Sequence, residues 1–432
     1  MKSIWNNIKK PRFNSLQGDI KTDVLIIGGG MCGVLCAYML KEAGVDCILV
    51  EADKICNGVT NSTTAKITLQ HGLIYDKIMK RYGTEKAQLY YESQKIAMEK
   101  LKTLASRTDS DFEVSNNMVY SLDDREAIEK EVRALEKIGC KTEFLRKTEL
   151  PFDIAGAVKV GEQGKFHPLK FAYAITDGLK IYENTKILEL KPHSAKTHQG
   201  TISAKKIIVA THFPFINKHG GYFLKMYQHR SYVLALEDAP DIKDMYVDEA
   251  KDGLSFRTHN GLLFLGGGSH RTGSKGGNWA ELERVSKKYY PSAGEVDRWA
   301  TQDCMTLDSI PYIGQYSKST PDLYVATGFN KWGMTSSMVS AMLLSDMVCG
   351  TKSEYEELYS PSRTILHPQI AINMFESVKG LVTPTTPRCP HLGCALKYNK
   401  EEHSWDCPCH GSRFDESGKL LNNPATDDKD KY

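Results

Sequence analysis

The chain has 432 residues, of which 41% are hydrophobic and 25% charged, and its formal net charge is +3. This size and composition predict two or three globular units with ample core, and a charge so near balance argues against a nucleic-acid partner. Residues 1–20 lack the apolar run of a signal peptide, and the longest apolar run, near Met338 to Val348, is short and contains Asp346. We therefore expect no transmembrane segment and a cytoplasmic location.

The first predicted elements form a nucleotide-binding unit. Thr22 to Ile27 is an apolar run typical of a buried parallel strand, and Gly28-Gly29-Gly30-Met31-Cys32-Gly33 follows it at the start of a helical stretch. A second strand is predicted from Val45 to Val50, and Glu51 stands directly after it, where an acid can bind ribose hydroxyls. In this pattern Gly28 makes the turn, Gly30 lets the backbone approach a pyrophosphate, and Gly33 allows close packing. The pattern fits both NAD and FAD.

The middle of the chain is predicted to form a second, mixed unit. Residues 74–106 are expected to be helical, Met118 to Leu122 to form a strand, and Asp123 to Ile138 a charged amphipathic helix. From Tyr222 to Phe264, apolar and polar residues alternate between turns, which predicts antiparallel sheet.

The C-terminal end carries two short loops that each offer a Cys and a His. They are Cys389-Pro390-His391-Leu392-Gly393-Cys394 and Cys407-Pro408-Cys409-His410-Gly411-Ser412. Two thiolates and two imidazoles suit a Rieske 2Fe-2S cluster, and zinc accepts the same set in a closed tetrahedron. A two-loop signature is more specific than a single Cys-x-x-Cys and favours the cluster. The segment from Cys389 to Tyr432 is too short to bury an adequate core, so we expect it to pack on the preceding domain.

These loops resemble those of high-potential Rieske proteins of the cytochrome bc type. The resemblance implies that Cys389 and Cys407 bind one iron of the cluster and that His391 and His410 bind the other. It also implies that Ser412 donates a hydrogen bond to a cluster sulfide. The remaining two cysteines of the loops, Cys394 and Cys409, are expected from the resemblance to form a disulfide, for which a zinc finger has no use.

Four other segments resemble the D-amino-acid oxidase superfamily of flavoproteins, which includes glycine and sarcosine oxidases. They are Gly58 to Lys66, Gln70-His71-Gly72, Ile310 to Gly314 and Tyr324 to Met334. The resemblance covers roughly residues 18–350 and implies that the nucleotide is FAD, beneath a pocket floored by the second sheet. It implies that the last turn opens a helix whose N-terminus faces the flavin. The FAD-binding residues that it adds to the glycine-rich turn and Glu51 are Thr63, Thr64, Lys66, Gly328, Gly333 and Met334.

Together these features predict an α/β fold with an α+β second domain. The Rossmann-like FAD-binding domain is expected to be discontinuous, comprising residues 18–73, 145–212 and 305–362. The antiparallel substrate domain is expected at 74–144 and 213–304. Residues 389–432 are predicted to form a small truncated Rieske β segment, with an N-terminal extension at 1–17 and a linker at 363–388.

The two motifs predict an FAD-dependent dehydrogenase that oxidises a small amine, N-methylated amine or amino acid. Electrons would pass from FAD through the 2Fe-2S cluster to an external one-electron carrier protein or quinone. The candidate substrate-positioning residues are Arg230, His270, Arg271 and Lys331, since a guanidinium can hold a carboxylate in bidentate fashion. Two alternatives stay open: a flavin reductase fed through the cluster by a ferredoxin-like donor, and an oxidase whose tail binds zinc.

Overall fold

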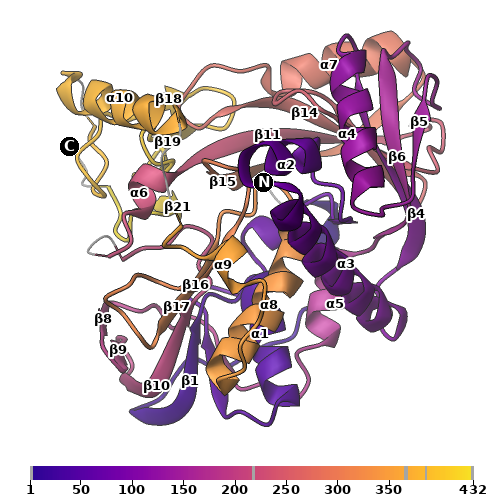
Figure 1. Cartoon of the computed structure of the whole chain (residues 1–432). Coiled ribbons are helices and arrows are strands. Elements are labelled where there is room, and N and C mark those ends of the chain that lie inside the picture. Colours follow the sequence, from indigo (N-terminus) through magenta and orange to yellow (C-terminus); the bar gives the residue numbers. More distant parts are fainter. Residues whose placement is uncertain (1–2, 217–218, 364–367, 385–386, 430–432) are drawn as a thin grey trace.

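The described residues form three sheets. The structure, a computed structural model, describes residues 3–216, 219–363, 368–384 and 387–429. An eight-stranded sheet lies at the bottom of Figure 1, a nine-stranded sheet crosses the top, and a four-stranded sheet lies at the upper left beside α10 (Pro368–Val382). This arrangement confirms the predicted α/β fold with an antiparallel second domain and a small C-terminal β segment.

The eight-stranded sheet is built around β1 (Ile20–Ile27), the strand that precedes the glycine-rich turn. β1 pairs in parallel with β2 (Cys47–Val50) on one side and β10 (Thr201–Val209) on the other. The strand order is β16-β17-β10-β1-β2-β7, and a β8–β9 hairpin pairs with β10. The added strands are β7 (Ile181–Tyr182), β8 (Glu189–Lys191), β9 (Ser194–Lys196), β16 (Tyr312–Gln315) and β17 (Leu323–Thr327).

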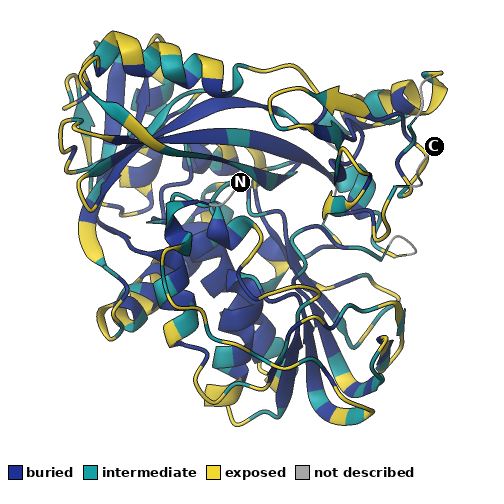
Figure 2. Ribbon diagram, turned by 180° about the vertical axis from the view of Figure 1, so that it is seen from behind, coloured by how far each residue is buried: buried dark blue, intermediate teal, exposed yellow. Residues whose placement is uncertain are grey.

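Side chains of β1 are buried on both faces of this sheet. Ile26 belongs to the core cluster on the face covered by α1 (Met31–Glu42) and α8 (Gly333–Cys349), whereas Leu25 and Ile27 belong to the cluster on the opposite face. A continuous apolar run is what such a strand requires. Figure 2 shows the strands of both large sheets mostly in the colour of buried residues.

The nine-stranded sheet runs in the order β15-β11-β14-β13-β12-β4-β6-β3, with β5 paired to β6. Its long strand β11 (Met226–Glu237) pairs with β14 (Leu262–Arg271) and β15 (Gly294–Thr306). α7 (Asn278–Tyr289) covers this part of the sheet with buried Trp279 and Leu282. The other strands are β3 (Lys66–Ile67), β4 (Glu113–Ser121), β5 (Thr142–Leu145), β6 (Gly156–Lys165), β12 (Met245–Asp248) and β13 (Ser255–His259).

The helices of the second unit fall close to their predicted ranges. The predicted helix over residues 74–106 is divided at Gly83, whose φ of 88° no helix permits, into α2 (Ile74–Tyr82) and α3 (Thr84–Ser106). α4 (Arg125–Lys137) begins after Asp124, whose carboxylate accepts a hydrogen bond from the Ala127 N–H. The shorter helices are α5 (Pro168–Ala174), α6 (Tyr222–Lys225) and α9 (Glu356–Tyr359).

Two segments differ from the predicted division of the chain. β6 lies in the nine-stranded sheet, although residues 145–212 were predicted to belong to the FAD-binding domain, because β6 pairs antiparallel with β4 along its whole length. The predicted linker at 363–388 contains α10, while residues 364–367 and 385–386 lie outside the described part. In the predicted N-terminal extension, Trp5 is fully buried and donates a hydrogen bond of 2.8 Å to the Thr63 carbonyl.

The Rieske segment has a very small core of its own. Its sheet comprises β18 (Lys397–Asn399), β19 (Ser404–Asp406), β20 (Arg413–Asp415) and β21 (Leu420–Asn422). Beneath it Leu396, Phe414 and Ala425 pack with the four loop cysteines. The Asn423 amide donates to the carbonyls of Thr211 and Phe213, in the segment that follows β10. The expectation that this segment packs on the preceding domain is confirmed.

Candidate functional site

The glycine-rich turn between β1 and α1 has the geometry of a dinucleotide cradle. Gly28 has a φ of 107°, and a Cβ on Gly33 would lie 1.9 Å from the Gly28 carbonyl oxygen, so both positions require glycine. A Cβ on Gly30 would have only the Thr60 hydroxyl within 4 Å, at 3.6 Å. The N-cap residue of α1 is Gly30, which has no side chain that could cover the helix end. The backbone here can therefore receive a pyrophosphate at the positive end of the helix.

Glu51 and Thr60 shape this turn. The Glu51 carboxylate accepts hydrogen bonds from the Gly29 N–H at 2.7 Å and the Asp53 N–H at 2.9 Å. Burial raises the pKa of Glu51 above its ordinary value, and these N–H groups oppose the shift. The Thr60 hydroxyl accepts from the Met31 N–H at 3.0 Å. Thr60 was not among the predicted site residues, although it lies in a segment that carried the family resemblance.

A cavity of about 420 Å³ lies between the nine-stranded sheet and the segments that lead into α2 and α8. Its lining includes predicted FAD-binding residues from two separate segments, together with Lys331, which was predicted to position substrate. Residues of β11, β14 and β15 complete the lining, so the second sheet covers the cavity as the resemblance implies. The predicted residues that meet here are Thr63, Thr64, Lys66, Lys331, Gly333 and Met334. Gly328 is not in the lining; its φ is 73° and its Cα packs near Thr306.

The cavity holds buried charges of both signs. Burial raises the pKa of Asp303 to about 6, and the Lys331 and Arg230 charges oppose this shift. Burial lowers the pKa of the Lys331 ammonium, against the opposing effect of Asp303. Burial also lowers the pKa of Lys66 to about 7 and that of His229 to about 2. At neutral pH Asp303 is therefore mostly a carboxylate and the His229 imidazole is uncharged.

His71 and Trp332 form one wall of the cavity. Their rings are stacked with centroids 5.1 Å apart, and both residues are in the lining. The His71 imidazole is held by the Tyr90 hydroxyl at 2.7 Å and the Thr335 hydroxyl at 3.0 Å. The wall therefore joins the loop before α2 to the first turn of α8.

The other three predicted substrate-positioning residues do not line the cavity. Arg230 forms an ion pair with Glu402 of the Rieske segment, and Arg271 donates to the carbonyls of Pro408 and Cys409 in the second cluster loop. His270 lies between the Tyr232 hydroxyl and the Arg271 carbonyl. Their predicted contacts with substrate stay predictions, and the contacts that the structure shows are with the C-terminal segment or its supports.

The two cluster loops have the same backbone conformation. Cys389 N–H donates to the Cys394 carbonyl and Gly393 N–H to the Cys389 carbonyl; in the second loop Cys407 N–H donates to Ser412 and Gly411 N–H to Cys407. Gly393 and Gly411 both have positive φ, 78° and 85°. Each loop therefore directs the side chain of its first cysteine inward, and both thiols are buried.

The groups predicted to hold the cluster are gathered between these loops. The rings of His391 and His410 lie edge to face with centroids 4.9 Å apart. His410 is buried, and neither of its ring nitrogens has a hydrogen-bond partner among the described residues. Cys394 and Cys409 form a disulfide that ties the loops together, and the Cys407 sulfur lies within 4.8 Å of both disulfide sulfurs. A buried imidazole without partners fits a metal-ligand role.

Strands β11 and β15 separate the cavity from the cluster loops. Tyr227, His229 and Ser231 of β11 line the cavity, whereas the alternate residue Gln228 donates to the His410 carbonyl at 2.9 Å. On β15, Thr301 and Asp303 line the cavity, and Gln302 between them donates to the Gly411 carbonyl at 2.9 Å. Because side chains alternate along a strand, one sheet contacts the flavin-side cavity and the cluster loops at once. The alternation of side chains along these strands could be predicted from the sequence. The sequence did not tell that the cavity lies on one face and the cluster loops on the other.

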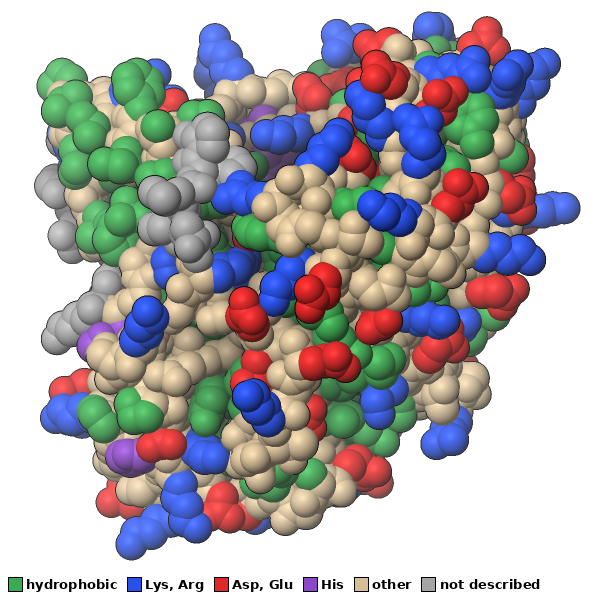
Figure 3. All heavy atoms as spheres, in the orientation of Figure 1, with side chains coloured by type: hydrophobic (Ala, Val, Ile, Leu, Met, Phe, Trp, Pro, Cys, Tyr) green, Lys and Arg blue, Asp and Glu red, His purple; other side chains and the backbone are tan. Residues whose placement is uncertain are grey.

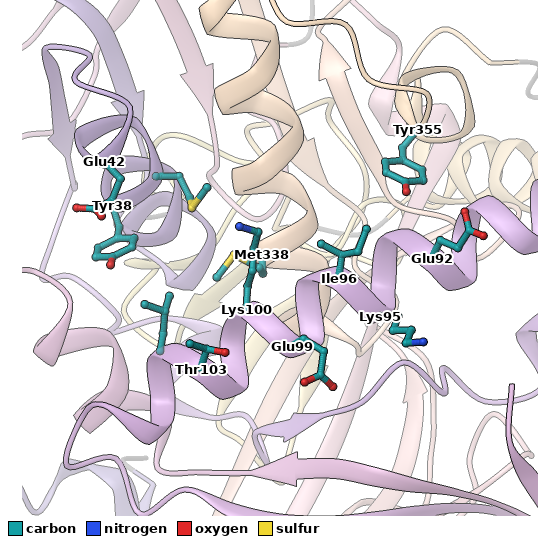
Figure 4. Close-up of a pocket in the computed structure, with 12 residues that line it drawn as sticks. Tyr38, Glu42, Glu92, Lys95, Ile96, Glu99, Lys100, Thr103, Met338 and Tyr355 are labelled. Atoms are coloured by element: carbon teal, nitrogen blue, oxygen red, sulfur yellow. The ribbon is translucent and has the colours of Figure 1, made fainter.

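A second hollow lies on the outside of the FAD-binding domain. It is an open groove of about 710 Å³ between α1, α3 and α8. Figure 4 shows its floor of Tyr38, Ile96 and Met338, edged by charged side chains such as Lys95 and Glu99. It contains none of the residues predicted to bind FAD or the cluster.

Comparison with known protein families agrees with both the glycine-rich turn at the start of the chain and the cluster loops at its end. The profile of FAD dependent oxidoreductases (DAO) matches residues 23–347, and that of the Rieske [2Fe-2S] domain matches residues 347–432. The chain belongs to the DAO family of FAD dependent oxidoreductases. It is an oxidoreductase that binds FAD in its first domain and a 2Fe-2S cluster in its C-terminal Rieske domain. The Rieske match decides against the zinc alternative, and it extends over α10.

Individual relatives of this DAO-family oxidoreductase share its architecture to different extents. A Bacillus subtilis (strain 168) protein named provisionally as a Rieske 2Fe-2S iron-sulfur protein, YhfW, is 33% identical over 96% of this chain and 94% of its own. Gamma-glutamylputrescine oxidoreductase of Escherichia coli (strain K12) is 24% identical over 80% of this chain and 87% of its own. Glycine oxidase from Geobacillus kaustophilus superposes with a TM-score of 0.67 at 19% identity, covering 80% of this chain and 99% of that one, which shows the shared fold.

Proposed function

We propose that this protein is a dehydrogenase that oxidises a small amine, N-methylated amine or amino acid. The electron pair taken up by FAD leaves singly through the Rieske cluster to a one-electron carrier protein or a quinone. The observation that supports the route is the placement of His229 and Gln228, adjacent on β11: one lines the cavity and the other binds the second cluster loop. One layer of sheet lies between this cavity and the second cluster loop.

The charges of the cavity support the proposed substrate class. Asp303 offers a carboxylate to an ammonium group, and Lys331 offers an ammonium to a carboxylate. A zwitterionic amino acid or an amine with an acidic group matches this pair. FAD supplies a hydride acceptor when it is bound, so the protein has to orient the substrate and exclude water rather than provide a strong base.

We propose Cys389, Cys407, His391 and His410 as the cluster ligands. Their support is the pair of like-shaped loops, the buried thiols and the ring nitrogens of His410, for which the described part of the chain offers no hydrogen-bond partner. We also propose a cytoplasmic location. It is supported by the buried unpaired cysteines of the FAD-binding domain, which suit a reducing compartment, while the disulfide is itself buried. These unpaired cysteines are Cys32, Cys36, Cys47 and Cys56.

Anaerobic stopped-flow measurement tests the proposed direction of electron flow. The holoenzyme is mixed with glycine, sarcosine or gamma-glutamylputrescine while flavin absorbance and cluster absorbance are followed together. With a substrate, flavin bleaching should precede cluster reduction. If a reduced ferredoxin reduces the cluster first and no amine bleaches the flavin, the reverse flow is correct.

A variant without the cluster tests whether substrate can bleach the flavin when no electrons can pass to the cluster. Cys407→Ser should remove the EPR signal of the 2Fe-2S centre and leave flavin bleaching by substrate intact. Cys349→Ser, which changes an exposed free thiol, is the matched control and should retain both signals. Loss of flavin bleaching in Cys407→Ser with full FAD content would contradict the proposed order.

A further inference from the structure

Helix α10 packs against the protein with its polar and small side chains. Its buried face carries Asn373, whose amide group binds the Arg271 guanidinium at 3.0 Å and the Leu224 carbonyl at 3.2 Å. Gly380 is also buried, because a Cβ there would lie 2.5 Å from the Cys409 sulfur of the disulfide. The Gly380 carbonyl accepts from the Ala395 N–H next to the first cluster loop. The named contacts that hold α10 in place are therefore hydrogen bonds and the close approach of its Gly380 backbone to the disulfide.

The opposite face of α10 exposes apolar side chains to solvent. A surface helix ordinarily buries its apolar stripe and exposes its polar face, and α10 does the reverse. Figure 3 shows the resulting patch of hydrophobic side chains at the upper left, over the position that α10 has in Figure 1. The patch consists of Ile372 (50% exposed), Met374 (52%), Phe375 (64%), Val378 (56%), Leu381 (50%) and Val382 (73%).

This apolar face continues to the edge of the cluster site. A Cβ on Gly393 would lie 3.8 Å from a methyl group of Leu381, so the first cluster loop touches the end of the helix. In the same loop Leu392, which follows the proposed ligand His391, is 40% exposed. His410, by contrast, is buried against the second domain. The loop that carries His391 is therefore next to the apolar face, and the loop that carries His410 is next to β11 and β15 of the second domain.

Basic residues accompany the apolar face. Residues 368–400 contain four basic side chains, Lys379, Arg388, Lys397 and Lys400, and a single acidic one, Glu376. The three lysines are exposed. Protein interfaces are depleted in lysine, whereas helices that lie in a membrane interface combine an apolar face with lysine and arginine that attract anionic lipid. Among the described residues, no helix has the length and apolar character to cross a membrane.

We propose that the outer face of α10, with Leu392, lies in the surface of an anionic lipid bilayer. This contact places the His391 side of the cluster at the membrane, so that the final electron acceptor is a lipid-soluble quinone, which takes the two electrons of the substrate one at a time from the cluster and two protons from water to become a quinol. The inference rests on the proposed function for the electron route, but membrane binding itself does not depend on the substrate. Attachment is peripheral, through one helix face and the flanking charges.

Vesicle flotation of the holoenzyme tests the proposal. The full chain, loaded with both cofactors, is floated with vesicles of equal parts phosphatidylglycerol and phosphatidylcholine at low salt, and in parallel with pure phosphatidylcholine vesicles. Binding should be strong with the anionic vesicles, weak with the neutral ones and reduced by salt. Phe375→Glu with Val378→Glu should lower the partition coefficient by about tenfold or more. Lys379→Glu with Lys397→Glu should abolish the preference for anionic vesicles.

Val114→Glu is the matched control, since Val114 is 56% exposed on β4 and lies outside the patch. It should float like the wild type. Flavin-to-cluster electron transfer, measured without vesicles, should be unchanged in Phe375→Glu/Val378→Glu, so a failure of membrane binding is distinguishable from a failure of the electron route.

Three results would overturn the proposal. The wild type fails to float with anionic vesicles, or the Phe375→Glu/Val378→Glu variant floats equally well. In the third, light scattering finds a dimer that this variant dissociates, which assigns the face to a second copy of the chain.

Discussion

The Arg230 guanidinium on β11 forms a bidentate ion pair with the Glu402 carboxylate of the Rieske domain. The side chains are 4% and 10% exposed, and the distance from Arg230 Nε to Glu402 Oε1 is 3.0 Å. Arg413 Nη2 donates to the same carboxylate at 2.9 Å, and the Tyr232 hydroxyl donates to it at 3.1 Å. One carboxylate therefore joins the second domain to the Rieske domain and neutralises charge on both sides of the interface.

Glu402→Gln should loosen the attachment of the Rieske domain. Removing one partner of a buried pair leaves charge uncompensated and typically costs about 3–5 kcal/mol. Here both Arg230 and Arg413 lose their shared counterion, although Arg413 keeps Asp406 at 2.9 Å. We expect a lower urea midpoint for loss of the cluster absorbance and slower reduction of the cluster by the flavin. Glu99→Gln, which removes the exposed partner of Lys102, is the control and should change neither value measurably.

The same attachment should weaken in acid. Burial would raise the pKa of Glu402, but the charges of Arg230 and Arg413 outweigh it and hold the pKa below its ordinary value. A carboxylate of this kind contributes stability that is complete above its unfolded pKa of about 4.3 and is lost as the pH falls through its lower folded pKa. Urea unfolding of the Rieske domain between pH 6 and pH 3 should show this loss, and Glu402→Gln should show less of it. Equal acid sensitivity in both proteins would contradict the assignment.

The parts of the site that sequence reasoning found are local in the chain. The glycine-rich turn and the two cluster loops each lie within six consecutive residues, and their chemistry follows from residue types at fixed spacing. The partner of Arg230 could not be found in this way, because Glu402 lies 172 positions further along the chain. An arginine on a predicted strand of the substrate domain fitted a substrate clamp equally well. The sequence also does not tell which face of β11 lies against the cavity and which face lies against the Rieske domain.

Three other features could be assigned only from the fold. β6 lies within residues 145–212, which were predicted for the FAD-binding domain, and only its pairing with β4 assigns it to the second sheet. α10 lies in the segment 363–388 that was predicted as a linker, and its exposed apolar face does not match the pattern of a helix that packs on a core. Asp303 carries no motif, and it becomes a candidate only through its place on β15 beside the cavity.

Gly33→Ala should abolish FAD binding. The added methyl group would lie 1.9 Å from the Gly28 carbonyl oxygen, a backbone atom that cannot move without opening the turn between β1 and α1. The ratio of flavin to protein absorbance in the purified variant measures the loss. Gly58→Ala is the control, since its Cβ meets nothing within 4 Å and its φ is −89°. A yellow Gly33→Ala protein with a normal flavin ratio would show that the turn does not hold the pyrophosphate.

Asp303→Asn should remove the acidic limb of the pH profile of turnover. If the Asp303 carboxylate binds the substrate ammonium, kcat/KM for a zwitterionic substrate rises with pH through about 6, the pKa to which burial raises this group. Asparagine does not titrate, so the variant should have a lower kcat/KM and no such limb.

Asp303→Asn should lower kcat/KM but raise the stability of the protein at high pH. This difference separates a role of Asp303 in binding substrate from a structural role. A group with a raised folded pKa destabilises the protein as the pH rises from its unfolded pKa of about 3.9 through its folded value. The full difference amounts to at most about 3 kcal/mol above pH 7. Asp303→Asn should therefore unfold at higher urea than the wild type at pH 8, and the advantage should vanish near pH 4. A variant that is less stable at pH 8 would mean that the Asp303 carboxylate is held by a cation in the resting protein.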